Sequence, residues 1–485
     1  MRKWESEKVS TKPNEHRTLN TLSHLPAFAP SSSRPSWLQR RLHASYLFTS
    51  SFTWWWRRRF TKSGWLVFIS IIATGMMGVD TNLSLAYQAF VFLSFLFIAA
   101  LAGTQFSRTR VAAERVLPRF GSVGQPVSYR VTLTNLTDRT QRGLDVTEDL
   151  ADPRPTLAQF ASTPEPGEER RNWYDRNNGF YRYTWLLLQN IRAKVNEQPC
   201  PDLPPRGSAD VRLDITPLRR GVVRFEAVAV ACPDAFGLFR TFVRVPLADA
   251  LLILPKRYFL PPLELPGQLK YQHGGVSLAV SVGESEEFVS LRDYRPGDPV
   301  RHLHWPSWAK TGEPIVKEFQ DEFFTRHALI LDTFLPVAAS EVFEEAVSVA
   351  ASLACTVQAQ ESLLDLMFVG PEAYCFTMGR GVGHVEQLLE ILASVQPCCD
   401  RQFSSLLRLV LQHAGDLSGC LCVFVEWDAS RQEFVRRLRE LGVPLMVFVV
   451  TAAGAPPPEP GPMAGEPERF HRLEVGKVAE GLAKL

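Results

Sequence analysis

The chain lacks a strong charge of either sign. Its 53 basic and 51 acidic residues leave a formal net charge of only +2. A nucleic-acid-binding domain normally has a clear excess of basic residues, so nucleic acid is not expected to be the main partner. The chain has 485 residues, of which 45% are hydrophobic. That is enough to form more than one hydrophobic core, and we expect several domains.

The eight cysteines form no framework. No Cys-x-x-Cys occurs, Cys398 and Cys399 are adjacent, and Cys420 and Cys422 alternate in an apolar run. Structural zinc sites and disulfide-rich secreted domains need cysteines at regular paired spacings. We therefore expect small, buried, free thiols in a reducing compartment and no structural zinc. No cofactor is expected for the chain.

Charge is almost absent between residues 64 and 106, where Asp80 is the only charged side chain. The run is too long for one membrane span, and each half approaches the roughly 20 residues that cross a bilayer. It therefore predicts a two-helix transmembrane hairpin at 61–107 that turns at Asp80. Arginines and a lysine precede it at 57–62, more arginines follow at 108–115, and the turn has neither. This distribution predicts that both ends and the soluble domains lie on the cytoplasmic side.

Two further interpretations concern the region before the apolar run. A secretory signal is the competing explanation, but the run begins after residue 60 and is about twice the usual length of a signal peptide. The tryptophans at 54–56 beside the arginines are typical of a membrane interface. Residues 1–60 show no sustained period and are predicted to form a disordered basic segment.

Residues 108–258 have the pattern of an antiparallel β-sandwich, because stretches such as 127–133 alternate apolar and polar residues. The segment 164–204 interrupts the pattern and is interpreted as an insertion loop or long hairpin. Near the end of the region, Asp234 and Gly237 are expected to shape a turn while Phe236 and Phe239 fill the sandwich core.

A linker and a motif-rich segment at 259–327 lead to an α/β domain at 328–485. Its strands are almost continuously apolar and alternate with helices, which is typical of a sheet buried on both faces in a doubly wound fold. The predicted strands are 328–332, 363–369, 374–378, 421–426 and 444–450, and the predicted helices are 342–360, 385–395, 404–413 and 431–441. The Pro- and Gly-rich residues 452–466 are interpreted as a flexible excursion before a last strand and helix.

The segment 291–319 carries the most specific motif in the chain, LRDYRPGDPVRHLHW followed by AKTGEPIVKEF. Its spacing resembles the signature of a widespread prokaryotic membrane-anchored family known as domain of unknown function 58. The turn at 232–240 and the Arg-Arg-Gly at 219–221 also resemble that family. The matching signature residues, our candidate partner-binding set, are Arg292, Tyr294, Pro296, Gly297, Asp298, Arg301, His304, Trp305, Lys310, Gly312 and Lys317, with Phe319 at the end.

The early pair of strands with no helix between them resembles a von Willebrand factor type A fold. Metal-binding members present Asp-x-Ser-x-Ser after the first strand, because hard divalent cations take oxygen ligands. Here Asp332 is followed by Phe334 and Pro336 at the two serine positions. We therefore predict a degenerate site without metal, in which backbone amides hold Asp332, although Thr333 and Asp428 could supply oxygens.

Two interpretations of the signature are left open. In the first, it is a folded cap held by buried ion pairs, with Arg292, Arg301 and Lys317 facing Asp298, Glu287 and Glu318, and with Trp305 and Tyr294 packed between them. In the second, arginine and aromatic side chains form a surface that recognises a partner protein.

We expect a non-enzymatic, membrane-tethered interaction protein. The family resemblance implies a MoxR-type AAA+ ATPase as partner, with a transglutaminase-like membrane protein encoded nearby, and a role in assembling or maturing an envelope complex. One alternative is a hydrolase using Asp298 and His304, with Ser307 as a conceivable nucleophile although no Gly-x-Ser-x-Gly surrounds it. The other is a metal-dependent adhesion module at Asp332. Separately, His302 and His304 would face the same side if their segment were a strand, which suggests a metal or acid–base site.

Overall fold

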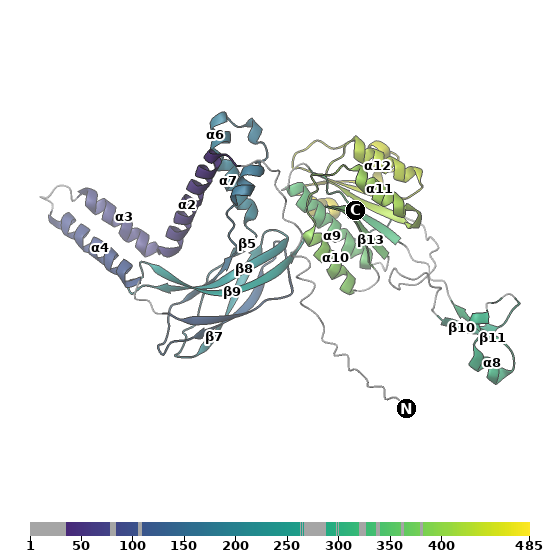
Figure 1. The fold of residues 1–485 in the computed structure, drawn as a ribbon, viewed down its shortest axis with the longest axis horizontal. Coiled ribbons are helices and arrows are strands. Elements are labelled where there is room, and N and C mark those ends of the chain that lie inside the picture. Colours follow the sequence, from purple (N-terminus) through teal and green to yellow (C-terminus); the bar gives the residue numbers. More distant parts are fainter. Residues whose placement is uncertain are drawn as a thin grey trace, which may run out of the picture. The chain divides into compact units, whose positions relative to one another are not determined.

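The computed structural model divides the chain into two compact units, which are described separately. The first unit holds Met1–Arg59 and Asp152–Ile191, and the second holds Phe60–Ala151 and Arg192–Leu485. The structure describes residues 35–77, 84–104, 109–261, 263, 265, 288–296, 298, 300–319, 326–335, 340–359, 363–378 and 382–485. Within these residues it contains several β-sheets and many helices, as the prediction of a multidomain chain requires (Figure 1).

The described residues of the first unit are mainly helical. Its long helix α2 (Trp37–Arg59) packs through His43 and Tyr46 on an aromatic cluster with Phe160 and Tyr183. The shorter helices are α5 (Leu157–Ser162), η2 (Glu168–Arg170), α6 (Trp173–Asn178) and α7 (Phe180–Asn190). Two predictions are corrected here: residues 37–59 are helical rather than disordered, and the insertion is helical over much of its length rather than a loop or hairpin. Residues 1–34 lie outside the described part of the chain.

Two apolar helices begin the second unit, α3 (Lys62–Met77) and α4 (Ser84–Gly103). They pack on each other, with Phe68 and Phe97 5.9 Å apart between ring centroids (Figure 1). Among the described residues, one helix, at Leu85–Gly103, is long and apolar enough to cross a membrane, and Lys62–Met77 is apolar but shorter. The predicted turn at Asp80 falls outside the described residues.

A domain of two β-sheets follows, here called the two-sheet domain. In the described residues one sheet has the order β1-β3-β7-β5 and the other β2-β9-β8-β4-β6; the pairs are antiparallel except for β2 with β9. Side chains from both sheets, including Leu133, Leu213 and Val230, share one core. The strands are β1 (Val111–Val116), β2 (Phe120–Ser122), β3 (Val127–Asn135), β4 (Asp145–Leu150), β5 (Ala193–Val195), β6 (Gln198–Pro199), β7 (Ser208–Pro217), β8 (Gly221–Pro233) and β9 (Arg240–Leu254).

The C-terminal α/β domain is built on a sheet of order β14-β13-β12-β15-β16-β17, parallel throughout its described strands except for β14. Its strands are β12 (Arg326–Leu331), β13 (Leu363–Val369), β14 (Ala373–Met378), β15 (Gly419–Phe424), β16 (Leu445–Thr451) and β17 (Phe470–Glu474). The helices are α9 (Glu341–Ala359), α10 (Val382–Ser394), α11 (Ser404–His413), α12 (Ala429–Glu440) and α13 (Val478–Leu482), with short turns η4 (Ala414–Asp416), η5 (Gly461–Met463) and η6 (Pro467–Arg469).

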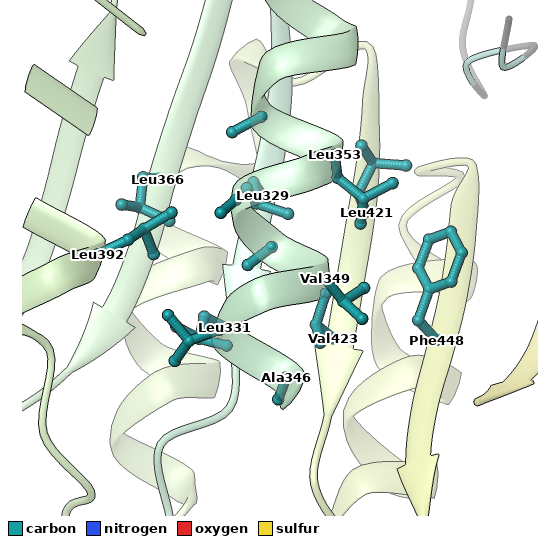
Figure 2. Packing of buried hydrophobic residues seen from close by; sticks show 14 of the residues in the cluster. Leu329, Leu331, Ala346, Val349, Leu353, Leu366, Leu392, Leu421, Val423 and Phe448 are labelled. Atoms are coloured by element: carbon teal, nitrogen blue, oxygen red, sulfur yellow. The ribbon is translucent and has the colours of Figure 1, made fainter. Parts of the chain in front are cut away.

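Successive residues of the sheet face opposite layers, which explains the continuous apolar runs. Leu329 and Leu331 pack with α9 and α10, whereas Ala328 and Ile330 pack with α11 and α12. Figure 2 shows α9 packed over β12 and β15, with Val349 of the helix beside Val423 of β15. Both faces of the sheet are therefore covered, as predicted for a doubly wound domain.

Two smaller predictions have clear outcomes. The residues 452–466 were expected to form a flexible excursion, but Met463 is fully buried in the core and Trp427 donates to the Glu459 carbonyl at 2.7 Å. This prediction was wrong because these contacts with the α/β domain fix a segment whose composition is typical of a linker. The eight cysteines are free, as expected, and most are buried or partly buried; Cys399 is the exposed exception.

The turn between β8 and β9 contacts the apolar helices. Asp234 shapes the turn by accepting hydrogen bonds from the amides of Phe236 and Phe239, as predicted. Phe239 does not fill the domain core: its ring lies 4.8 Å from Phe60 and 5.0 Å from Phe97. Phe236 is exposed. The expectation that both rings plug the two-sheet domain is thus corrected.

The opposite end of the same hairpin contacts the α/β domain. Arg220, directly before β8, is buried and donates to the carbonyls of Leu392 and Val395 at 3.2 and 2.6 Å, and its guanidinium pairs with Glu344. These carbonyls lie at the end of α10, where helix carbonyls lack partners. Leu252 and Leu254 of β9 add apolar contacts to the α/β core, while Ile253 between them faces the two-sheet core.

The first prediction tests the contact between the turn and α3. A Cβ atom at Gly64 would lie 2.2 Å from the Leu238 carbonyl oxygen, so Gly64→Val must push the turn away. The hydrogen bonds from Thr61 to Gly237 and Leu238 would be lost. We expect a loss of about 1–3 kcal/mol in the free energy of unfolding, measured by denaturant titration of the full chain in detergent.

Gly103→Val is the matched control, because a Cβ there meets nothing within 4 Å. Equal stability of the Gly64 and Gly103 variants, with unchanged amide exchange at 234–240, would contradict the contact.

Candidate functional site

The signature residues fold into a small substructure of their own elements: β10 (Phe288–Asp293), η3 (Val300–His302), α8 (Trp305–Thr311) and β11 (Ile315–Phe319). β10 and β11 pair antiparallel, with Arg292 opposite Val316. The His304 amide donates to the Ile315 carbonyl at 2.8 Å, and Leu303 forms a bridge with Val316. Leu303 and Val316 are buried, so they form the centre of this substructure.

One ion pair shapes the turn after β10. Both terminal guanidinium nitrogens of Arg292, Nη1 and Nη2, donate to the Asp298 carboxylate at 2.7 Å, and the Arg295 amide donates to the same carboxylate at 2.8 Å. Hydrogen bonding to Arg292 and to that amide lowers the pKa of Asp298 to about 2. The geometry is the bidentate fork of arginine and carboxylate, which fixes orientation as well as charge. This pair, predicted from the sequence, is confirmed, although Arg292 remains about one-third exposed.

Helix α8 carries a stacked aromatic pair in which Trp305 is exposed and Trp308 is half-buried. The rings of Trp305 and Trp308 stack at 5.2 Å with an interplanar angle of 19°, and Trp305 is 59% exposed. Lys310, in the last turn, is exposed, where a cation is favoured by the helix dipole. Gly312 ends the helix with φ 79°, a left-handed conformation that glycine adopts without strain.

The interpretation of the signature as a buried ionic cap is therefore confirmed for one ion pair and wrong for two other side chains. Arg292 and Asp298 do pair, but Trp305 and Arg301 lie at the surface and are not packed inside a cap. Pro296 is exposed, while Tyr294 and Lys317 are half-buried. Gly297, Glu287 and the side chain of Glu318 fall outside the described part of the structure.

The residues proposed for hydrolysis are not brought together as a triad. His304 Nδ1 lies 2.7 Å from the Ser307 hydroxyl, one helical turn along α8. Asp298 is engaged by Arg292 and the Arg295 amide instead. Among the described residues, no group of three or more His, Cys, Asp or Glu side chains is arranged to hold a metal ion. The arrangement at His304 is thus a local contact at the start of a short helix.

Asp332 lies at the carboxyl end of β12, where the chain order of the sheet reverses between β12 and β15. It is fully buried and accepts hydrogen bonds from the amides of Phe334 at 3.0 Å and Val425 at 3.4 Å. The prediction that backbone amides hold Asp332 is confirmed. This is the edge at which open α/β sheets usually place a ligand.

A residue that the sequence interpretation did not consider completes this site. Arg431, from the first turn of α12, donates to Asp332 at 3.1 Å, to Asp428 at 2.9 Å and to the Phe334 carbonyl at 3.1 Å. Burial raises the pKa of Asp332 to about 6, with Arg431 opposing the rise. The guanidinium is therefore an internal cation whose donors occupy the Asp332 carboxylate.

Thr333 was the other residue expected to be able to supply an oxygen ligand to a metal. Its hydroxyl instead donates a hydrogen bond to the Val369 carbonyl. The signal for Arg431 was the spacing Asp428-x-x-Arg431 at a helix start, where Asp428 caps the Arg431 amide at 2.9 Å. Nothing in that local spacing connects it to Asp332.

Comparison with known proteins supports the resemblance of the signature. Residues 290–422 match the family described as "Protein of unknown function DUF58". The chain is 28% identical to "Uncharacterized protein YeaD" of Bacillus subtilis over 188 residues, which are 38% of this chain and 46% of that protein. The chain thus spans about half the length of the curated relative it matches. The family match at residues 290–422 runs from the signature into the α/β domain.

Solved structures give no further information about the fold. The CARDB domain of the PF1109 protein of Pyrococcus furiosus is 12% identical, with 31% of this chain and 91% of that chain covered and a TM-score of 0.16. The sporulation control protein Spo0M of Bacillus subtilis is 10% identical, with 30% and 49% covered and a TM-score of 0.14. Likenesses at these scores carry no argument.

The second prediction concerns Arg431. Replacing it with methionine leaves the Asp332 carboxylate buried without its counter-charge, which should cost about 3 kcal/mol or more in the free energy of unfolding at pH 7. The folded-state pKa of Asp332 is already above its unfolded value and would rise further, so the folded variant binds more protons and its stability falls as pH rises. The loss should therefore shrink between pH 7 and pH 5.

Denaturant titration at both pH values measures this loss. Arg436→Met is the control, since Arg436 lies exposed on the same helix and pairs with Glu433 at the surface. Equal stability of the two variants at pH 7 would contradict the internal cation.

The third prediction separates the surface of the signature from its centre. Trp305→Ala should change stability by about 1 kcal/mol or less, since it loses little beyond the ring stacking. Leu303→Ala should cost about 2–5 kcal/mol, because it leaves a cavity. Amide exchange of β10 and β11 measures the loss of stability in both variants. A larger loss for Trp305→Ala than for Leu303→Ala would support the interpretation of the signature as a buried cap.

Proposed function

We propose that the chain is a non-enzymatic, membrane-tethered interaction protein whose signature segment docks a partner protein. The observation that carries this proposal is Trp305, which is exposed on α8 beside Lys310 and stacks on the half-buried ring of Trp308. Tryptophan and arginine are enriched at the energetic centres of protein interfaces. Val300, Arg301, Trp305 and Lys310, all exposed, are called the signature face.

The rest of the chain gives this face a support and an anchor. In the proposal, the two-sheet domain is a β-sandwich that acts as a spacer, and the α/β domain is a von Willebrand factor type A-like platform. Its strand order, with the antiparallel β14 at one edge, supports this assignment. Arg431 in the Asp332 site favours docking without a metal over metal-dependent adhesion.

The anchor is proposed to be a transmembrane hairpin of α3 and α4 with the soluble domains in the cytoplasm. Their mutual packing, their apolar composition and the basic residues before α3 support the proposal. As the family resemblance implies, the proposed partner is a MoxR-type AAA+ ATPase, acting with this chain in assembly or maturation of an envelope complex.

The fourth prediction tests the signature face. Trp305→Ala and Lys310→Ala should each weaken binding of the purified MoxR-type ATPase by about 2 kcal/mol, or roughly 30-fold, without unfolding the chain. Trp173→Ala and Lys477→Ala are matched controls, because both side chains are exposed elsewhere. Binding constants are measured with the full chain in detergent.

Two results would count against the proposal. If all four variants bind the ATPase as the unaltered chain does, the signature face is not the docking surface. If the unaltered chain binds no ATPase and solubilised membranes yield no partner that depends on Trp305, the interaction function itself is lost.

A further inference from the structure

Among the described residues of the first unit, 35–59 and 152–191, one face of helix α2 carries large exposed apolar side chains. The helix buries His43 and turns Tyr46 and Ser50 toward Tyr183, so one face belongs to the unit's aromatic cluster. Phe48, at 73% exposed, lies on another face.

Phe48 begins an aromatic stripe along that face. Phe48 stacks on Phe52 at 6.4 Å, and Phe52 stacks on Trp55 at 6.5 Å. These residues are spaced by four and three positions, which places them on one side of a helix. The stripe is therefore a continuous exposed apolar surface of three large rings.

The charge of α2 is of one sign. Its sequence WLQRRLHASYLFTSSFTWWWRRR contains five arginines and neither aspartate nor glutamate. Three of the arginines form the last turn, at 57–59, and two of these lie over indole rings: Arg58 is 4.8 Å from the Trp54 ring centroid and Arg59 is 5.0 Å from that of Trp55. Aromatic side chains and arginines together are typical of helices that lie in the membrane interface.

The position of this turn in the chain indicates that a lipid surface covers the exposed face of α2. Two residues separate Arg59 from α3, which begins with Lys62, contains no other charged residue and is mostly apolar. If α3 and α4 are in a bilayer, the last turn of α2 can lie no more than a few residues from the headgroups. Basic residues immediately beside a membrane helix attract anionic lipids.

We infer that α2 is a lipid-binding helix, whose Arg57–Arg59 turn binds anionic headgroups while Phe48, Phe52 and Trp55 insert between the lipids. This inference rests on the proposed membrane anchor and adds a choice of lipid to it. The partner is a lipid surface with a negative charge, and neither a protein nor a nucleic acid is required.

The test uses the full chain in nanodiscs of phosphatidylcholine alone or with one-third phosphatidylglycerol, and measures amide exchange across residues 44–59. Exchange should be about tenfold or more slower in the anionic discs at low salt, because each arginine near an anionic surface contributes about fivefold to binding. The difference should diminish at high salt, where screening is stronger.

Matched variants show which side chains cause the lipid dependence of amide exchange. Arg57→Gln with Arg59→Gln should abolish the lipid dependence, whereas Arg40→Gln with Arg41→Gln removes the same charge about 24 Å away along the helix and should leave most of it. Phe48→Ser with Phe52→Ser should speed exchange in both kinds of disc.

Three results would overturn the inference: equal exchange in both lipids, equal effects of the two arginine pairs, or protection that follows the number of chains per disc and ignores lipid charge. The last would assign the stripe to a second copy of this chain. Failure of the chain to remain in any disc would instead contradict the membrane anchor, so the two failures are distinguishable.

Discussion

The hairpin of β8 and β9 is the element on which the second unit depends. β8 has 13 residues and β9 has 15, so the paired strands extend over about 40 Å at 3.3 Å per residue. One end places Phe239 against the apolar helices, and the other places Arg220 against the end of α10. A pair of hydrogen-bonded strands resists bending better than a linker, so contacts at both ends restrain the apolar helices relative to the α/β domain.

Two buried arginines among the described residues of this unit, Arg220 and Arg431, join segments that are distant in the chain. Arg220 forms an ion pair with Glu344 and hydrogen bonds with helix carbonyls. Arg431 forms ion pairs with Asp332 and Asp428. Each guanidinium is removed from water and bound by acceptors from separate segments. A buried charge is tolerated under such conditions and becomes costly when one partner is removed. Each arginine thereby fixes the geometry of the segments that it joins.

The sequence predicted the α/β domain well because its strands are buried on both faces and its helices have a clear period. Prediction from the sequence failed where contacts between distant segments determine the structure. Helix α2 lacks a strong period, and its stability comes partly from Phe160 and Tyr183, which are more than 100 residues away. Met463 fixes a segment whose proline and glycine content is typical of a linker.

The candidate site divides in the same way. The Arg292–Asp298 pair is local, six residues apart, and could be predicted from the motif. The exposure of Trp305 depends on which other elements reach it, and a motif holds no such information. Arg431 and Asp332 are 99 residues apart and meet only because α12 follows the strand beside β12.

The restraint imposed by the β8–β9 hairpin is the central claim, and a distance measurement tests it most directly. Spin labels at Ser63 in α3 and Glu341 in α9, both exposed positions, report on the two ends through double electron–electron resonance of the full chain in nanodiscs. We predict one narrow distance distribution, which becomes broad when Arg220→Met removes the contact at one end. A broad distribution in the unaltered chain, or no change on Arg220→Met, would contradict the claim.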